Sequence, residues 1–238
     1  MVSVTLNEPV GCYVARHPQT SRVFEAHQID YCCGGDQPLQ QACRDRELDP
    51  QQIAGQLEQA IADDETPRDD WLQASLTDLC DHIEQTHHAY LQTELPRLTQ
   101  MIDKVLDAHG ESHPKLHDVQ HVFAALCAEL QPHMFKEERI LFPAIRRMEQ
   151  STATPSFPFG TVANPINMME HEHDNAGAAL SQLRALTSGY QPPTEACNTY
   201  RAMLDGLREL EANMHQHVHK ENNILFPRAI ELERAFAG

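Results

Sequence analysis

Two eleven-residue segments of the chain share one pattern of histidine and glutamate, H-x-x-K-E-x-x-I-L-F-P. They begin at His133 and His217 and lie 84 residues apart. In each segment a glutamate, Glu137 or Glu221, follows the histidine by four residues, so both side chains would share one face of a helix. Imidazole nitrogen and carboxylate oxygen both bind transition metals. The repeated pair therefore indicates a metal site.

The face that carries each pair is otherwise apolar. The neighbours on the stripe are Leu126, Leu130, Ile140 and Leu141 in the first segment, and Leu207, Leu210, Met214, Ile224 and Leu225 in the second. Burying a carboxylate without a partner in such a core would cost on the order of several kcal/mol of folding free energy. A single His-x-x-x-Glu pair is most often solvated, but two copies within one repeated pattern favour a shared metal charge inside a helical bundle.

Other histidines could complete the ligand set. His173 lies on the apolar stripe of a third segment, formed by Ile166, Met169, Leu180 and Leu183. Nearer the N-terminus, helical steps from Leu76, Cys80 and Ile83 reach His87 as well as they reach His88. Periodicity alone therefore leaves the choice between these two histidines open.

A rival metal geometry uses other carboxylates. Glu84 with His87, and Glu170 with His173, match the E-x-x-H spacing of ferritin-like di-iron carboxylate proteins. This alternative would leave the histidines of both repeated segments without a role in the core. We therefore regard it as the weaker hypothesis.

The elements that must position these side chains are helices, since alternating β-branched runs are absent. We expect four long helices, and the duplicated pattern predicts that they form one antiparallel bundle. The expected ranges are 72–108 with a kink at Pro96, 114–148, 164 to just before Gly189 with Asn164 as cap, and 194–235, with a loop at 151–163.

The predicted domain organisation has three parts. Residues 1–60 form a small helical domain containing a Cys-Cys-Gly-Gly turn, the polar segment 61–70 is a linker, and residues 71–238 form the four-helix bundle. The fold class is thus all-α.

Composition limits the partners and the compartment. The net charge of -17, from 35 acidic and 18 basic residues, disfavours nucleic acid and anionic membranes as partners. Charged residues interrupt every apolar run before membrane-spanning length, and the N-terminus lacks the pattern of a signal peptide. Together with seven cysteines, this predicts a reducing, cytoplasmic location.

The adjacent cysteines Cys32 and Cys33 precede Gly34 and Gly35. Neighbouring cysteines form only strained disulfides, so this pair is not a stable cross-link. The thiols could relay electrons or iron, or could simply occupy a turn. The other five cysteines are expected to be small core residues, namely Cys12, Cys43, Cys80, Cys127 and Cys197.

Taken together, these motifs resemble the repair-of-iron-centres family of hemerythrin-like di-iron proteins. The resemblance rests on the run 29–35, His87-His88, Glu94-Leu95-Pro96, both repeated segments and Glu172-His173-Asp174. It implies a hemerythrin-like antiparallel four-helix bundle holding two non-haem iron ions with an oxo or hydroxo bridge. The metal ligands that it implies are His88, His109, His133, Glu137, His173, His217 and Glu221. This set leaves one coordination position open for a small ligand.

The resemblance also implies a function. We expect a cytoplasmic protein that helps to repair iron–sulfur clusters damaged by nitric oxide or oxidative stress, by donating iron or by binding or reducing nitric oxide. Its partners would be damaged iron–sulfur proteins and nitric oxide or dioxygen, and a homodimer is left open. The alternatives are a carrier or sensor of these gases without turnover, and a ferritin-like oxidase or iron store. A simple carrier needs no thiol domain, and the histidine-rich site argues against ferritin-like chemistry.

Overall fold

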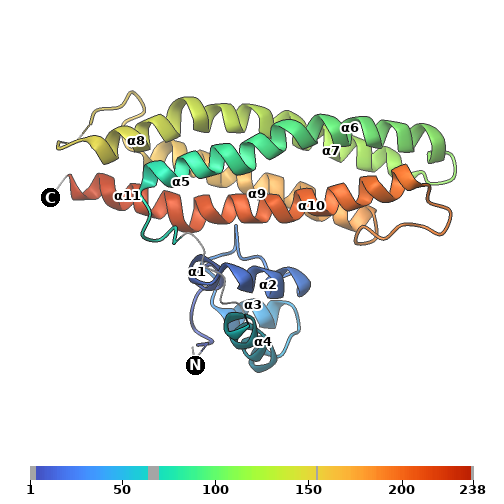
Figure 1. Ribbon diagram of the computed structural model, residues 1–238, viewed down its shortest axis with the longest axis horizontal. Helices are drawn as coiled ribbons and strands as arrows, with labels where there is room; N and C mark the ends of the chain where they lie inside the picture. Colours follow the sequence, from blue (N-terminus) through green and yellow to red (C-terminus); the bar gives the residue numbers. More distant parts are fainter. Residues whose placement is uncertain (1–3, 64–69, 154, 237–238) are drawn as a thin grey trace. The chain divides into compact units, whose positions relative to one another are not determined.

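The computed structural model describes residues 4–63, 70–153 and 155–236. Helices dominate these residues, and no β-strand forms within them beyond two isolated bridges (Figure 1). The all-α prediction is confirmed. Most of the predicted linker, residues 64–69, lies outside the described residues, while Ile61 and Ala62 belong to helix α4 (Pro50–Ala62).

The chain divides into two compact units. One consists of Met1–Leu79 with His215–Gly238, and the other of Cys80–Met214. Both boundaries fall inside helices, α5 (Leu76–Ile83) and α10 (Asn198–Lys220). The division at residues 60 and 71 that the sequence suggests remains a prediction.

The unit 80–214 contains the long helices of the bundle. They are α6 (Ala89–His109), α7 (Lys115–Lys136), α8 (Phe142–Gln150), α9 (Ala163–Leu186) and the first part of α10. Helix α7 packs against both α6 and α9. A Cβ atom added to Gly206 would lie 2.7 Å from Cδ2 of Leu98, so glycine permits the close approach of α10 to α6.

Three of the long helices are interrupted by a π-helical turn. These turns are η2 (Glu84–His88) between α5 and α6, η3 (Glu137–Leu141) between α7 and α8, and η4 (Glu221–Leu225) between α10 and α11 (Phe226–Ala235). A π turn widens the helix by one residue and is frequent at functional sites. Each of the three contains a residue that the sequence suggested as a metal ligand.

The predicted helix ends hold in part. Pro96 lies inside α6, which continues through it to His109 as predicted. The prediction of Asn164 as the cap of the third helix was wrong: α9 already begins at Ala163, and the Asn164 amide instead donates a hydrogen bond to the carbonyl of Phe159 (2.8 Å). Gly189 has a φ of +72°, and its N–H donates to the carbonyl of Arg184, as expected for a glycine that closes a helix.

The other unit contains the four short N-terminal helices α1 (Val10–Arg16), α2 (Ser21–Ala26), α3 (Leu39–Asp45) and α4, together with η4 and α11. Its core includes Val10, Tyr13, Phe24, Leu39, Ile53 and Leu57. Asp49 caps α4 by accepting a hydrogen bond from the N–H of Gln51 (2.9 Å).

Glycine allows α1 and the cysteine turn to approach Asn223 of η4 closely. A Cβ atom added to Gly35 would lie 2.0 Å from Oδ1 of Asn223, and one added to Gly11 would lie 2.5 Å from the same atom.

None of the helices in the described part of the chain combines the length and the apolar character needed to span a membrane.

Candidate metal centre

Within the unit 80–214, three imidazoles and one carboxylate converge in the core. Nε2 of His88 and Nε2 of His133 each lie 3.3 Å from Oε2 of Glu137. Nε2 of His173 lies 3.2 Å from Nε2 of His133. All four residues are buried. Three segments of chain, η2 with α6, α7 with η3, and α9, thus supply nitrogen and oxygen atoms to one place.

The other unit holds the second repeated pair. Nε2 of His217 lies 3.0 Å from Oε1 of Glu221, and both residues are fully buried. The side chains lie on one helix face because they are four residues apart, as the sequence predicts.

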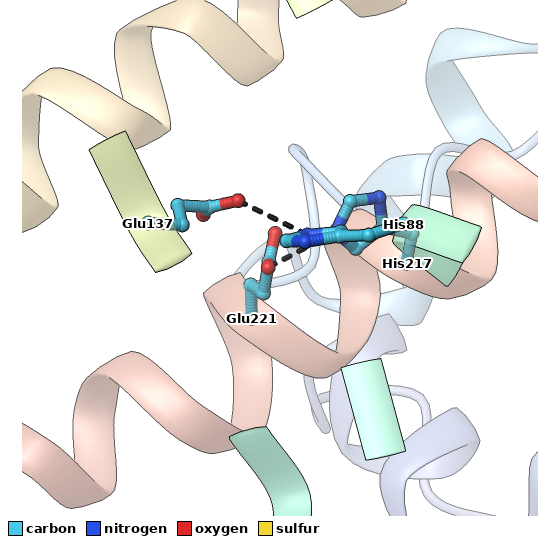
Figure 2. A group of neighbouring side chains, drawn as sticks. All are labelled: His88, Glu137, His217 and Glu221. Atoms are coloured by element: carbon cyan, nitrogen blue, oxygen red, sulfur yellow. Dashed lines mark hydrogen bonds and ion pairs between the residues drawn. The ribbon is translucent and has the colours of Figure 1, made fainter. Parts of the chain in front are cut away.

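These six residues form two groups of four that could each hold a metal ion. The first group is His88, Glu137, His217 and Glu221, and the second is His133, Glu137, His173 and Glu221. Within each group, the ligand atoms all lie within 4.8 Å of one another. Figure 2 shows both carboxylates of the first group directed toward its imidazoles. Both groups contain the same two glutamates, which is the arrangement that bridging carboxylates require.

The chemistry of the donors fits iron. All the donors are imidazole nitrogens or carboxylate oxygens, a set that suits iron, manganese or zinc. Glu137 and Glu221 are both fully buried, and a cation would offset the cost of removing their charges from water.

Two further carboxylates orient the imidazoles. Nδ1 of His88 lies 3.0 Å from Oε1 of Glu138, and Nδ1 of His133 lies 2.8 Å from Oε2 of Glu172. These contacts leave Nε2 of each ring for the cluster, an arrangement that is usual for metal-binding histidines. Sequence reasoning missed the role of both glutamates. The only available signal was their position beside ligand candidates, Glu138 after Glu137 and Glu172 before His173.

Glu172 is itself held in the charged form. Burial alone would raise the pKa of Glu172, but hydrogen bonds from Lys136 and His133 outweigh it and hold that pKa below its ordinary value. Lys136, the lysine of the first repeated segment, forms an ion pair with Glu172 and so helps to hold the carboxylate that contacts His133. A charged Glu172 in turn favours a proton on Nδ1 of His133.

His87 and His88, between which periodicity left the choice open, have different surroundings in the structure. His88 belongs to the first group, whereas Nδ1 of His87 lies 3.1 Å from Oδ1 of Asn213. The carboxylates of the ferritin-like alternative, Glu84 and Glu170, are in neither group. Glu84 instead pairs with Arg146 at 3.1 Å.

The structure does not bring His109 into either group. Its Nε2 lies 3.3 Å from Sγ of Cys197, and its ring packs against those of His113 and Tyr200. The ligand set suggested by resemblance therefore separates into six residues that lie together and one that lies elsewhere.

The cysteine turn is organised by Asp30. Oδ1 of Asp30 accepts hydrogen bonds from the N–H groups of Cys32 and Cys33, each at 3.0 Å, and from the Cys32 thiol at 3.2 Å. These three residues form a third group of potential metal ligands. Hydrogen bonding to Cys33 and burial raise the pKa of Cys32 well above its ordinary value, so Cys32 stays a thiol at neutral pH.

The cysteine turn is tied to the helix that bears His217. Nδ2 of Asn223 donates to the carbonyl of Cys32 at 2.9 Å, and Nε2 of Gln216 donates to the Tyr31 hydroxyl at 2.9 Å. The ring of His219 packs edge-on against Tyr31. His219 is buried, and desolvation lowers its pKa to about 4, which keeps the ring neutral.

The cysteines depart from expectation in two places. All seven are free. Cys43 and Cys80 are buried as predicted, but the core assignment was wrong for Cys12 and Cys197, which are exposed. Cys197 directly precedes α10, where the chain enters the helix, rather than lying on its apolar face.

Comparison with known proteins agrees with this architecture. The model of the hemerythrin HHE cation binding domain matches residues 81–229, and a second model, a domain of unknown function called DUF542, matches residues 6–61. The chain is 37% identical over 227 residues to the iron-sulfur cluster repair protein YtfE of Yersinia pseudotuberculosis serotype IB (strain PB1/+) and to that of Yersinia pestis (strain Pestoides F). Each alignment covers 95% of this chain and 98% of the relative.

Proposed function

The chain belongs to the hemerythrin HHE cation-binding family, and from this premise we propose that it binds two iron ions and helps to repair damaged iron–sulfur clusters. The observation that carries the proposal is the pair of buried groups that share Glu137 and Glu221. The relatives named as iron–sulfur cluster repair proteins match along nearly their whole length, including the cysteine domain, and this supports the same task here.

In the proposed centre, each group would hold one iron. His88 and His217 would hold the first ion and His133 and His173 the second, and Glu137 and Glu221 would serve both ions. When bound, iron supplies one-electron redox chemistry and open positions for a small ligand such as nitric oxide or dioxygen. With His109 outside the site, the centre has more open positions than the sequence suggested.

The surrounding residues hold the donors in place. Glu138 and Glu172 fix the ring orientations of His88 and His133 through their Nδ1 atoms. The burial of all six donor residues keeps bulk water away from the ions.

Repair is favoured over simple gas carriage by the cysteine turn. Cys32 and Cys33 lie in a domain that the relatives share, and a carrier would not require thiols. We assign these two residues to the transfer of iron or electrons toward damaged iron–sulfur proteins in the cytoplasm. The raised pKa of Cys32 means that this thiol must lose a proton when it acts.

The test is an anaerobic repair assay. A [4Fe–4S] enzyme inactivated by nitric oxide is incubated with the chain loaded with ⁵⁷Fe, with the iron-free chain, or with free ⁵⁷Fe at the same concentration. We expect activity to return fastest with the loaded chain, and the label to appear in the cluster if iron is donated. Equal recovery with the iron-free chain would refute the proposal. Nitric oxide binding without any recovery would favour the carrier.

A further inference from the structure

A cavity of about 730 Å³ lies beside the loop that connects α8 to α9 (Figure 1), within the unit 80–214. Its lining comes from the end of α7, from η3 and α8, from the loop, and from the first part of α9. The volume falls in the range of about 300–1,000 Å³ that is usual for small-molecule sites. None of the six proposed metal ligands belongs to the lining, so this cavity is separate from the metal centre.

Most of the lining is apolar, and part of it is open to water. Ile140 is 45% exposed and Met168 is 54% exposed, and both line the cavity. In the described part of the chain, the only other large apolar side chain that is exposed is Phe135, which is not in the lining. Exposed apolar surface gathered at one hollow favours a ligand with an apolar body.

The wall that the loop supplies is already formed. The rings of Phe157 and Phe159 stack with centroids 5.0 Å apart and planes 9° apart, and the Arg147 guanidinium lies 5.6 Å from the centre of the Phe157 ring. Phe157 also forms an isolated bridge with Gly160, whose φ is +80°. The Asn164 amide donates a hydrogen bond to the carbonyl of Phe159. Because these contacts fix the wall, a ligand would lose little affinity to ordering it.

The charge of the lining is opposite to that of the chain as a whole. Three cationic side chains line the cavity, namely Lys136, Arg139 and Arg147, and no acidic residue does, although the chain has a net charge of -17. Lys136 is paired with Glu172. Both arginines are exposed, and neither takes part in an ion pair within residues 4–63, 70–153 and 155–236. Guanidinium groups bind carboxylates through two parallel hydrogen bonds.

We propose that this cavity binds a small amphipathic carboxylate, that is, a molecule with one carboxylate and a large apolar body. The apolar body packs against Ile140, Met168 and the phenylalanine wall of the loop. The carboxylate is held by the guanidinium groups of Arg139 and Arg147. Asn164 is the only uncharged polar residue in the lining, so a sugar or a nucleotide would find few partners for its hydrogen-bonding groups.

The test is isothermal titration calorimetry of the iron-loaded full-length chain with decanoate as the probe. The alcohol 1-decanol and the amine decylamine have the same alkyl chain with a neutral and a cationic head. We expect one decanoate per chain, bound about tenfold or more tightly than decanol because of the charged hydrogen bonds, and no binding of decylamine. Each methylene removed from the carboxylate should weaken binding about fourfold. Equal affinities for the three head groups would overturn the proposal.

Variants place the bound probe in this cavity. Arg139→Gln with Arg147→Gln should weaken decanoate binding about tenfold or more but leave decanol binding unchanged, whereas Arg22→Gln, at an exposed arginine outside the lining, should change neither. Met168→Glu places a negative charge in the cavity and should abolish decanoate binding. Phe135→Glu makes the same change at an exposed residue outside the lining and should bind decanoate as the wild type does. Decanoate binding that survives in Met168→Glu, or that is lost equally in Phe135→Glu, would show that the cavity is not the site.

Discussion

Because both groups share the same two glutamates, single substitutions should change the iron content of the chain by different amounts. Glu137 belongs to both groups, whereas His173 belongs to one. We therefore predict that Glu137→Gln weakens both iron sites and that His173→Gln weakens only the second. Glutamine matches glutamate in size, so the first change removes the charge and the bridge without creating a cavity.

The expected magnitude follows from the number of sites affected. Loss of an outer partner of a metal ligand weakens metal binding by about 10- to 100-fold, so loss of a direct ligand should reach about 100-fold. When the concentration of free iron is about ten times the wild-type Kd, each wild-type site is about nine-tenths filled. A site whose affinity is weakened about 100-fold is then about one-tenth filled. The wild type should then hold about 1.8 irons per chain, His173→Gln about 1.0 and Glu137→Gln about 0.2.

The assay is colorimetric iron determination after anaerobic dialysis against buffered ferrous iron, with helical content checked by circular dichroism. Glu129→Gln is the matched control, because Glu129 is exposed on α7, the helix that leads into η3, and belongs to neither group. It should retain the wild-type iron content. If Glu137→Gln and His173→Gln each held one iron, Glu137 would not be shared, and the bridged centre would be refuted.

Three further predictions concern residues outside the two metal groups. Glu172→Gln should weaken iron binding by about 10- to 100-fold in the same dialysis assay. The pKa of Glu172 in the folded chain lies below its ordinary value of 4.5. The charged carboxylate therefore stabilises the fold above pH 4.5, and this stabilisation is lost as the pH falls through the folded pKa. The temperature of thermal unfolding of Glu172→Gln should accordingly depend less on pH in the acid range. Glu211→Ala should lower the free energy of unfolding in urea by about 2 kcal/mol, because it removes a 4% exposed carboxylate that accepts charged hydrogen bonds from Arg184, whereas Asp205→Ala, which breaks an exposed pair, should cost less than about 1 kcal/mol. Cys32→Ser with Cys33→Ser should leave the iron content and spectrum unchanged but slow cluster repair, and unimpaired repair would make the pair structural.

Residues four apart on an apolar face were predictable from sequence alone. His133 with Glu137 and His217 with Glu221 stand where helical spacing places them, and burial follows from their apolar neighbours. The short helices near the N-terminus were also predictable, because proline, glycine and aspartate mark the turns between them. In each case, the information lies within a few residues of chain.

His109 shows where resemblance and local sequence fail together. Its helix ends at His109 itself, so its direction depends on what lies beyond the end of the helix. Its contact is with Cys197, 88 residues later in the chain. Helical periodicity carries no information about a pairing at that separation.

The π turns explain why the rest of the ligand set could not be read from helical periodicity. An α-helix turns by about 100° per residue, so one extra residue moves every later side chain to a new face. In η3 this shift leaves Ile140 45% exposed and Leu141 1% exposed, although both were expected on the buried stripe. In η2 the same shift favours His88 over His87. All three turns coincide with candidate ligands, and a π turn is rarer and less favourable than a regular helix. A bound metal would offset that cost together with the cost of two buried carboxylates, so the irregular turns fit the proposed centre.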